Sequence, residues 1–200
     1  MEDFKFTGLF YTQGKDKFRK YLNIKLQSTN KTIPDLMVVM MNPGSSTPLN
    51  AIDNENVETE LIIDKTQNQI KAVMEACNFE YARVLNLSDF REPKSQSFYN
   101  EIPRLNKNSN HSIFSPIRQK DFNNLFIPNA PTILAWGVNT KLKDLANQAF
   151  KIISKNTNKT FYLTKDFNKC SFYHPLPRSV SKQNEWVSSI SKMINNQCER

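Results

Sequence analysis

Short apolar runs alternate with amphipathic stretches along the chain after residue 30. Continuous apolar runs are typical of buried strands, and they predict strands at 36–41, 81–87, 131–136 and 160–164. Apolar residues at helical spacing predict helices at 66–77, 142–153 and 186–194. This alternation favours parallel strands joined by right-handed crossovers.

We therefore predict an α/β fold, a three-layer α/β/α sandwich with a central, mainly parallel sheet of about four strands. The 200 residues suit one domain, with a core at about 33–197 and additional elements in residues 1–32. Within that N-terminal part, residues 4–11 and 18–26 fit either edge strands or a helix.

Two local signals refine this outline. Thr66 and Gln69 have the spacing of a capping box, which predicts that the first helix begins there. The segment 104–115 is rich in Asn and Ser and predicts a mobile loop.

Polar residues follow each predicted strand. In parallel sheets ligands bind beyond the carboxyl ends of the strands, so residues far apart in sequence can face one cleft. The residues at these ends are the run Asn42-Pro43-Gly44, then Asn86 with Ser88 and Asp89, then Gly137, and finally His174 after a short connection.

The first strand end reads MVVMMNPGSST from Met37 to Thr47. The Asn42 amide can hold a water molecule or a polar ligand, and Gly44 lets a ligand approach the main chain. Ser45, Ser46 and Thr47 offer donors that suit a phosphate. The alternative is an ordinary Asn-Pro-Gly turn without chemistry.

Asn86 and His174 offer the other candidate groups. An Asn amide can pair with a base edge, and by turning over it fits either uracil or cytosine. His174, in the run HPLPRS, can donate a hydrogen bond to a developing anion or act as a general acid. The alternatives are a capping or turn residue at 86 and a partly buried loop histidine at 174.

Composition adds a candidate partner. The formal charge of +8 suits a polyanion such as nucleic acid, although a merely basic surface is the alternative. The three cysteines form no Cys-x-x-Cys pair, so we expect neither a metal site nor a cofactor. Their number without a signal peptide, and the lack of a membrane-length apolar run, favour the cytoplasm.

These motifs, in this order, resemble the uracil-DNA glycosylase superfamily. MNPGSS resembles the Gly-x-Asn-Pro-Gly motif of the mismatch-specific uracil and thymine-DNA glycosylases, and VLNLS resembles the strand whose Asn reads the base. ILAWG and HPLPRSVS resemble a later strand and the loop that enters the duplex. The chain is also similar to a bacterial and phage family of unknown function with Asn-Pro-Ser, Asp-Pro-Thr, Trp-Gly and His-Pro-Leu motifs.

The resemblance implies roles for individual residues. Asn42 would position the attacking water, and His174 would stabilise the departing base. Asn86 would read the base. Two further base contacts are expected from the residues themselves: Met40 in the altered motif, and Phe90, an aromatic next to a basic residue that could stack on a base. Contacts to DNA would come from Arg178 at the position of the inserted wedge and from Ser45, Ser46, Ser179 and Ser181.

Two departures from the motif matter. Met40 replaces the first Gly of Gly-x-Asn-Pro-Gly, which puts uracil itself in doubt. Asn42 cannot take a proton, and the carboxylate that assists the water could be Asp53, Asp64 or Asp89. Asp64 stands where the similar bacterial and phage family has an Asp, and we take it as the third catalytic candidate.

The function expected from the resemblance is a monofunctional DNA glycosylase. It would remove a uracil-like base or a hypermodified phage cytosine from double- or single-stranded DNA and leave an abasic site, in repair or anti-phage defence, as a monomer. One alternative is a DNA-binding protein that kept the fold without the chemistry. Another is a hydrolase of free nucleotides, which would need no wedge.

Overall fold

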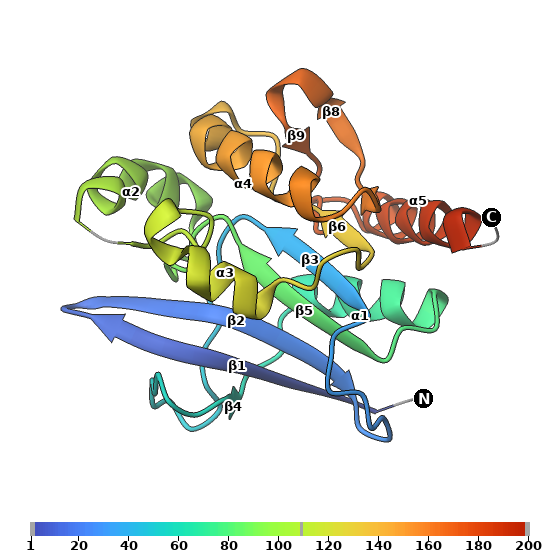
Figure 1. Ribbon diagram of the computed structural model, residues 1–200, viewed down its shortest axis with the longest axis horizontal. Coiled ribbons are helices and arrows are strands. Elements are labelled where there is room, and N and C mark those ends of the chain that lie inside the picture. The colour runs from blue at the N-terminus through green and yellow to red at the C-terminus, as the bar shows by residue number, and fades with distance from the viewer. Residues whose placement is uncertain (1–2, 109, 199–200) are drawn as a thin grey trace.

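A seven-stranded sheet runs through the computed structural model, which describes residues 3–108 and 110–198 (Figure 1). The strands lie in the order β4-β1-β2-β5-β3-β6-β7. Their bounds are β1 Phe4–Gln13, β2 Asp16–Leu26, β3 Leu36–Met40, β4 Thr59–Glu60, β5 Tyr81–Asn86, β6 Thr132–Leu134 and β7 Thr160–Phe161. A second, two-stranded sheet pairs β8, Thr164–Asp166, with β9, Ser171–Phe172.

The four predicted strands are confirmed as β5, β3, β6 and β7, and they are parallel. The predicted strand number is wrong, because residues 4–26 form the antiparallel hairpin β1–β2, and β2 continues the sheet beside β5. The short β4 then pairs with β1. The fold is thus α/β with a mixed rather than mainly parallel sheet.

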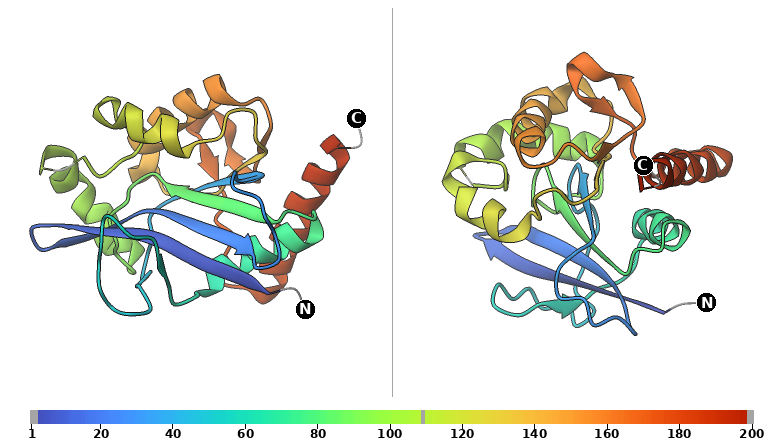
Figure 2. Two further views of the ribbon diagram at one scale, coloured as in Figure 1. Left: turned by 60° about the horizontal axis from the view of Figure 1, so that its bottom comes forward. Right: turned by 45° about the vertical axis from the view of Figure 1, so that its right-hand side comes forward.

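The described residues form five α-helices, which lie on the two faces of this sheet (Figure 2). Two of them, α1 (Lys65–Ala76) and α5 (Val180–Cys198), lie side by side on one face. The other face is covered by α2 (Ser95–Asn108), α3 (Gln119–Leu125) and α4 (Lys143–Asn156).

Alternation along the strands builds both halves of the core. In β3, Val38 packs with apolar residues of α1 and α5, whereas the next residue, Val39, packs with those of α2, α3 and α4. Strand β3 is therefore buried on both sides, which explains why its sequence is a continuous apolar run.

Two local expectations are corrected. The first helix has its capping box at Asp64 and Gln67 rather than at Thr66 and Gln69, so it begins earlier. The described residues of the segment 104–115, which leave out residue 109, do not form the predicted loop: α2 continues to residue 108, and the side chains of His111, Ile113 and Phe114 are buried.

The sequence pattern also missed α2 and α3, and it placed His174 after a short connection that follows the fourth strand. In the structure, β8 and β9 lie between β7 and His174. The main chain of Tyr173 donates to the carbonyl of Leu163, at 2.7 Å, which returns the chain to the sheet end before His174.

Candidate functional site

A cavity of about 560 Å³ lies at the carboxyl ends of the parallel strands. Its walls come from the segment after β3, the start of α1, the start of α2, the end of β6 and the His174 loop. The residues that line it are Arg19, Met40, Met41, Asn42, Pro43, Gly44, Ser45, Asp64, Lys65, Thr66, Gln67, Pro93, Ser95, Tyr99, Trp136, Gly137, His174 and Leu176. The predicted cleft therefore exists, and several of the predicted site residues meet in it.

The Asn-Pro-Gly turn is built by hydrogen bonds at both ends. Gly44 has a φ of +62°, a left-handed conformation that glycine adopts without strain, and the Ser46 main chain donates to the Pro43 carbonyl at 3.2 Å. The Asn42 Nδ2 donates to the carbonyls of Phe90 and Glu92 at 3.2 and 2.9 Å. Asn42 thus braces the segment after β5 and keeps only its amide oxygen for a ligand or water.

His174 lines the same cavity as this turn, as a neutral ring. Its Nδ1 accepts a hydrogen bond from the Leu176 main chain at 3.2 Å, so the proton of the neutral ring is on Nε2. Burial lowers the pKa of His174 to about 4, against an opposing effect of the Asp64 charge. At neutral pH the ring is therefore a hydrogen-bond donor without charge.

Of the three candidate carboxylates, only Asp64 lines the cavity. Asp53 forms a 2.5 Å ion pair with Arg91, and Asp89 forms one of the same length with Arg118. Asp64 is held in place by the helix it caps, because its Oδ1 accepts from the Gln67 main chain at 2.8 Å. The structure thus singles out one of the three carboxylates that the sequence left open.

Arg19 is a cavity residue that the sequence did not indicate. It lies on β2, is 1% exposed, and donates to the Ser46 hydroxyl at 2.9 Å and to the Asn86 amide oxygen at 3.1 Å. Burial lowers its pKa to about 10, so it remains charged at neutral pH. No pattern could have revealed it, since a register shift between β1 and β2 adjoins this position and arginines on strands are mostly exposed.

The structure does not place Asn86 on the cavity surface. It is 1% exposed and lies between two lining residues, Arg19 on β2 and Met40 on β3. A guanidinium only donates, so the atom facing Arg19 is the amide oxygen and the amide is not free to turn over. Its Nδ2 is buried without a hydrogen-bond partner in the described part of the chain.

Two further predicted contacts are also buried away from the cavity. The Ser46 hydroxyl accepts from Arg19 and is not presented to a phosphate, whereas Ser45 lines the cavity. Phe90 packs on Phe18 with ring centroids 5.7 Å apart. Among the neighbouring aromatics, Tyr99 lines the cavity.

The predicted DNA contacts after the His174 loop are exposed. Arg178, Ser179 and Ser181 lie around the first residues of α5, outside the cavity wall. Their position leaves them accessible to a large ligand.

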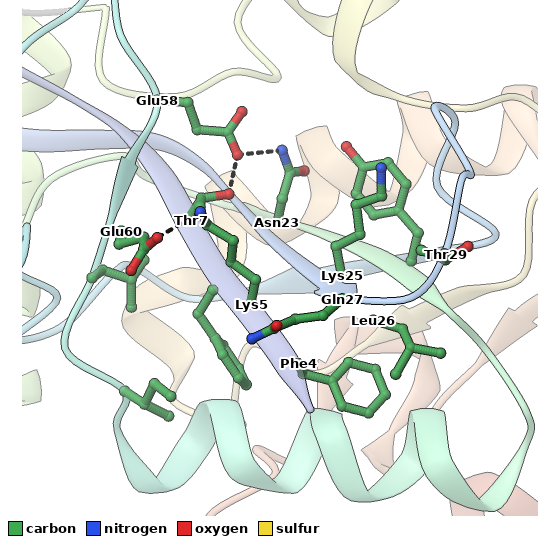
Figure 3. A pocket seen from close by; sticks show the side chains of 14 residues that line it. Phe4, Lys5, Thr7, Asn23, Lys25, Leu26, Gln27, Thr29, Glu58 and Glu60 are labelled. Atoms are coloured by element: carbon green, nitrogen blue, oxygen red, sulfur yellow. Dashed lines mark hydrogen bonds and ion pairs between the residues drawn. The ribbon is translucent and has the colours of Figure 1, made fainter. Parts of the chain in front are cut away.

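A larger cavity, of about 710 Å³, lies at the opposite ends of the parallel strands, over β1, β2 and β4 (Figure 3). Its two carboxylates already have partners: Glu58 accepts from Thr7 and Asn23, and Glu60 pairs with Lys5 at 2.5 Å. It holds none of the predicted site residues. We therefore place the candidate site in the smaller cavity.

Searches of the described residues add two observations. They contain no group of three or more His, Cys, Asp or Glu side chains that could hold a metal ion. No helix among them combines the length and the apolar character needed to span a membrane.

A family model described as "Protein of unknown function (DUF1643)" matches residues 19–176, most of the chain. The chain belongs to the DUF1643 family. No curated protein and no solved structure matches it significantly. The DUF1643 match begins at Arg19 and ends at Leu176, and it includes every residue that lines the cavity.

Proposed function

We propose that the chain is a monofunctional DNA glycosylase, which hydrolyses the N-glycosidic bond of a flipped, damaged or modified pyrimidine and leaves an abasic site. The observation that carries this proposal is the meeting of Asn42, Asp64 and His174 in one cavity. The three groups suit the three needs of the reaction: a placed water, a negative charge near the sugar, and a donor for the base.

His174 serves the leaving base. As the bond between C1′ and the base nitrogen breaks, its electron pair moves to the base, which becomes an anion. The His174 Nε2–H donates a hydrogen bond to that anion. A neutral ring suits this role, because its uncharged state at neutral pH requires no proton uptake before the reaction.

Asn42 and Asp64 serve the other side of the bond. The Asn42 amide oxygen accepts a hydrogen bond from water, and the water oxygen forms the new bond to C1′. Asp64 carries the negative charge that stabilises the positive sugar, and it is the cavity carboxylate that can receive the proton released by the water.

Base recognition involves Asn86, which is buried beside Met40 of the neighbouring strand rather than on the surface. Met40 is unbranched, so its side chain can move at low cost and expose the amide to an inserted base. Because Arg19 holds the amide oxygen, Asn86 presents one fixed orientation to the base. The fixed amide supports an enzyme that prefers one class of base, uracil-like or cytosine-like, over the other.

The remaining support comes from charge, motif order and architecture. A net charge of +8 and the exposed Arg178, Ser179 and Ser181 suit double- or single-stranded DNA. Helices on both faces support a three-layer α/β/α sandwich and the resemblance to uracil-DNA glycosylases. We propose a single domain acting as a cytoplasmic monomer in repair or anti-phage defence.

The test is a screen for abasic sites in DNA that carries uracil, mismatched thymine or hypermodified phage cytosines. We expect alkali-sensitive strand breaks with one of these substrates and their loss in Asn42→Ala. Asn168→Ala, an exposed asparagine outside the cavity, is the matched control and should retain activity. Activity that survives Asn42→Ala would refute the site. DNA binding without product on any substrate would refute the glycosylase.

A further inference from the structure

The positive charge of Arg19 has no negative partner in the described part of the chain. Its two Nη atoms donate to neutral acceptors, the Ser46 hydroxyl and the Asn86 amide oxygen. Its Nε is buried without a hydrogen-bond partner there, and no described carboxylate lies within ion-pair distance. A buried guanidinium without an ion pair thus lines the cavity, and Asp64 and Asp89 attract it only from beyond ion-pair distance.

Two other arginines with buried side chains differ from it. Arg118 pairs with Asp89, and Arg91 pairs with Asp53, each at 2.5 Å. Burying a charge without an ion pair costs far more than burying a paired one, so a buried arginine that lacks an ion pair beside a cavity indicates an anion that comes from outside.

We infer that the cavity binds an anionic pyrimidine nucleotide, and that Arg19 supplies the fixed positive charge that attracts the phosphate. Lys65, which also lines the cavity, adds a second positive charge. Tyr99 provides an aromatic wall on which a base can stack. A volume of about 560 Å³ is within the range of cavities that hold ligands of this size.

One charge on the cavity wall opposes an anion. Asp64 lines the same space, and its attraction for Arg19 partly offsets the effect of burial on the pKa of that arginine. The Asp64 carboxylate is already bonded to the start of α1 through the Gln67 main chain. With Arg19 and Lys65 positive and His174 neutral, the charged groups of the wall sum to a positive value.

This inference rests on the proposed function for the choice of pyrimidine nucleotides, but its test does not need catalysis. Binding of deoxyuridine and deoxycytidine 5′-monophosphates, of the two nucleosides, and of inorganic phosphate is measured by isothermal titration calorimetry. We expect each nucleotide to bind about tenfold or more tightly than its nucleoside, as expected for a charge-assisted contact. Inorganic phosphate should compete with the nucleotide.

Variants at position 19 test whether Arg19 causes the tighter binding of the nucleotide. Arg19→Gln keeps a hydrogen-bond donor but removes the charge, and should lose the preference for the nucleotide. Arg19→Lys keeps the charge and should retain it. Lys151→Met removes one exposed positive charge from α4 and is the control for net charge. Circular dichroism and thermal melting confirm that each variant is folded.

Equal binding of nucleotide and nucleoside by the wild type, or an unchanged preference in Arg19→Gln, would overturn the inference. The wild-type comparison stands even if the Arg19 variants do not fold. Base release from DNA without a nucleotide preference would refute this inference and leave the glycosylase. A preference for the nucleotide over the nucleoside without any abasic product would support this inference and refute the glycosylase.

Discussion

Acidification should destabilise the protein mainly through its two histidines. Burial lowers the pKa of both His111 and His174 from the ordinary 6.5 to about 4. The unfolded chain therefore binds these protons at a higher pH than the folded protein does. The stability that each neutral histidine contributes is complete above pH 6.5 and is lost as the pH falls toward 4.

Each histidine contributes about 3 kcal/mol over this window, since one pKa unit corresponds to about 1.4 kcal/mol. Asp89 acts in the opposite direction. Burial raises its pKa from 3.8 to about 6, despite Arg118, so the folded protein takes up this proton first and gains about 3 kcal/mol over nearly the same window. The net expected loss for the wild type between pH 7 and pH 4 is about 3 kcal/mol.

Urea unfolding followed by tryptophan fluorescence at several pH values measures this loss. His174→Gln removes one of the two titrating histidines, so its free energy of unfolding should change little between pH 7 and pH 4. The other titratable groups are present in both the wild type and the variant, so their contributions cancel in the difference between the two free energies of unfolding. If the wild type and the variant lost the same free energy on acidification, His174 would not be held neutral by burial and the reasoning would be refuted.

Three further predictions test the site and its support. Gly44→Ala should lower the free energy of unfolding by about 1 kcal/mol, through its positive φ alone, because an added Cβ meets no atom within 4 Å. Gly14→Ala is the matched control, because Gly14 has nearly the same φ and equally open space. Only the Gly44 variant should also lower base release. Arg118→Met should cost about 3–5 kcal/mol in urea unfolding, because it leaves Asp89 buried without its charge partner, and a cost below 1 kcal/mol would contradict that pairing. Arg178→Ala should lower base release from duplex DNA about tenfold while leaving nucleotide binding in the cavity unchanged, since Arg178 lies outside the cavity wall; an equal loss of both would place it in the cavity.

Much of the fold was predictable because local patterns carried it. The run that became β3 is apolar at every position, and such a run is typical of a strand that is buried on both sides. The polar residues that follow the predicted strands then indicated where a cavity would lie. The start of α1 was less certain, because Thr66–Gln69 and Asp64–Gln67 have the same spacing and only the folded chain shows which pair forms the cap.

The segment around His111 shows the opposite case. Its Asn- and Ser-rich composition indicated a loop exposed to water. In the structure, His111 bonds to Ser88 and Asn106, each at 2.8 Å, and the main chain of Asp89 donates to its carbonyl at 2.7 Å. Polar residues can be buried when their partners are supplied by distant segments, and composition does not reveal those partners.

The sequence by itself determined that Asn42 and Gly137 follow the parallel strands β3 and β6. Periodicity and turn chemistry act over a few residues, so they can be recognised without knowing the fold. Only the tertiary structure decided that Arg19 lies beneath this cavity and holds Asn86. That contact depends on the pairing of β2 with β5 and on a register shift in the hairpin, and long-range pairing leaves no local pattern to recognise.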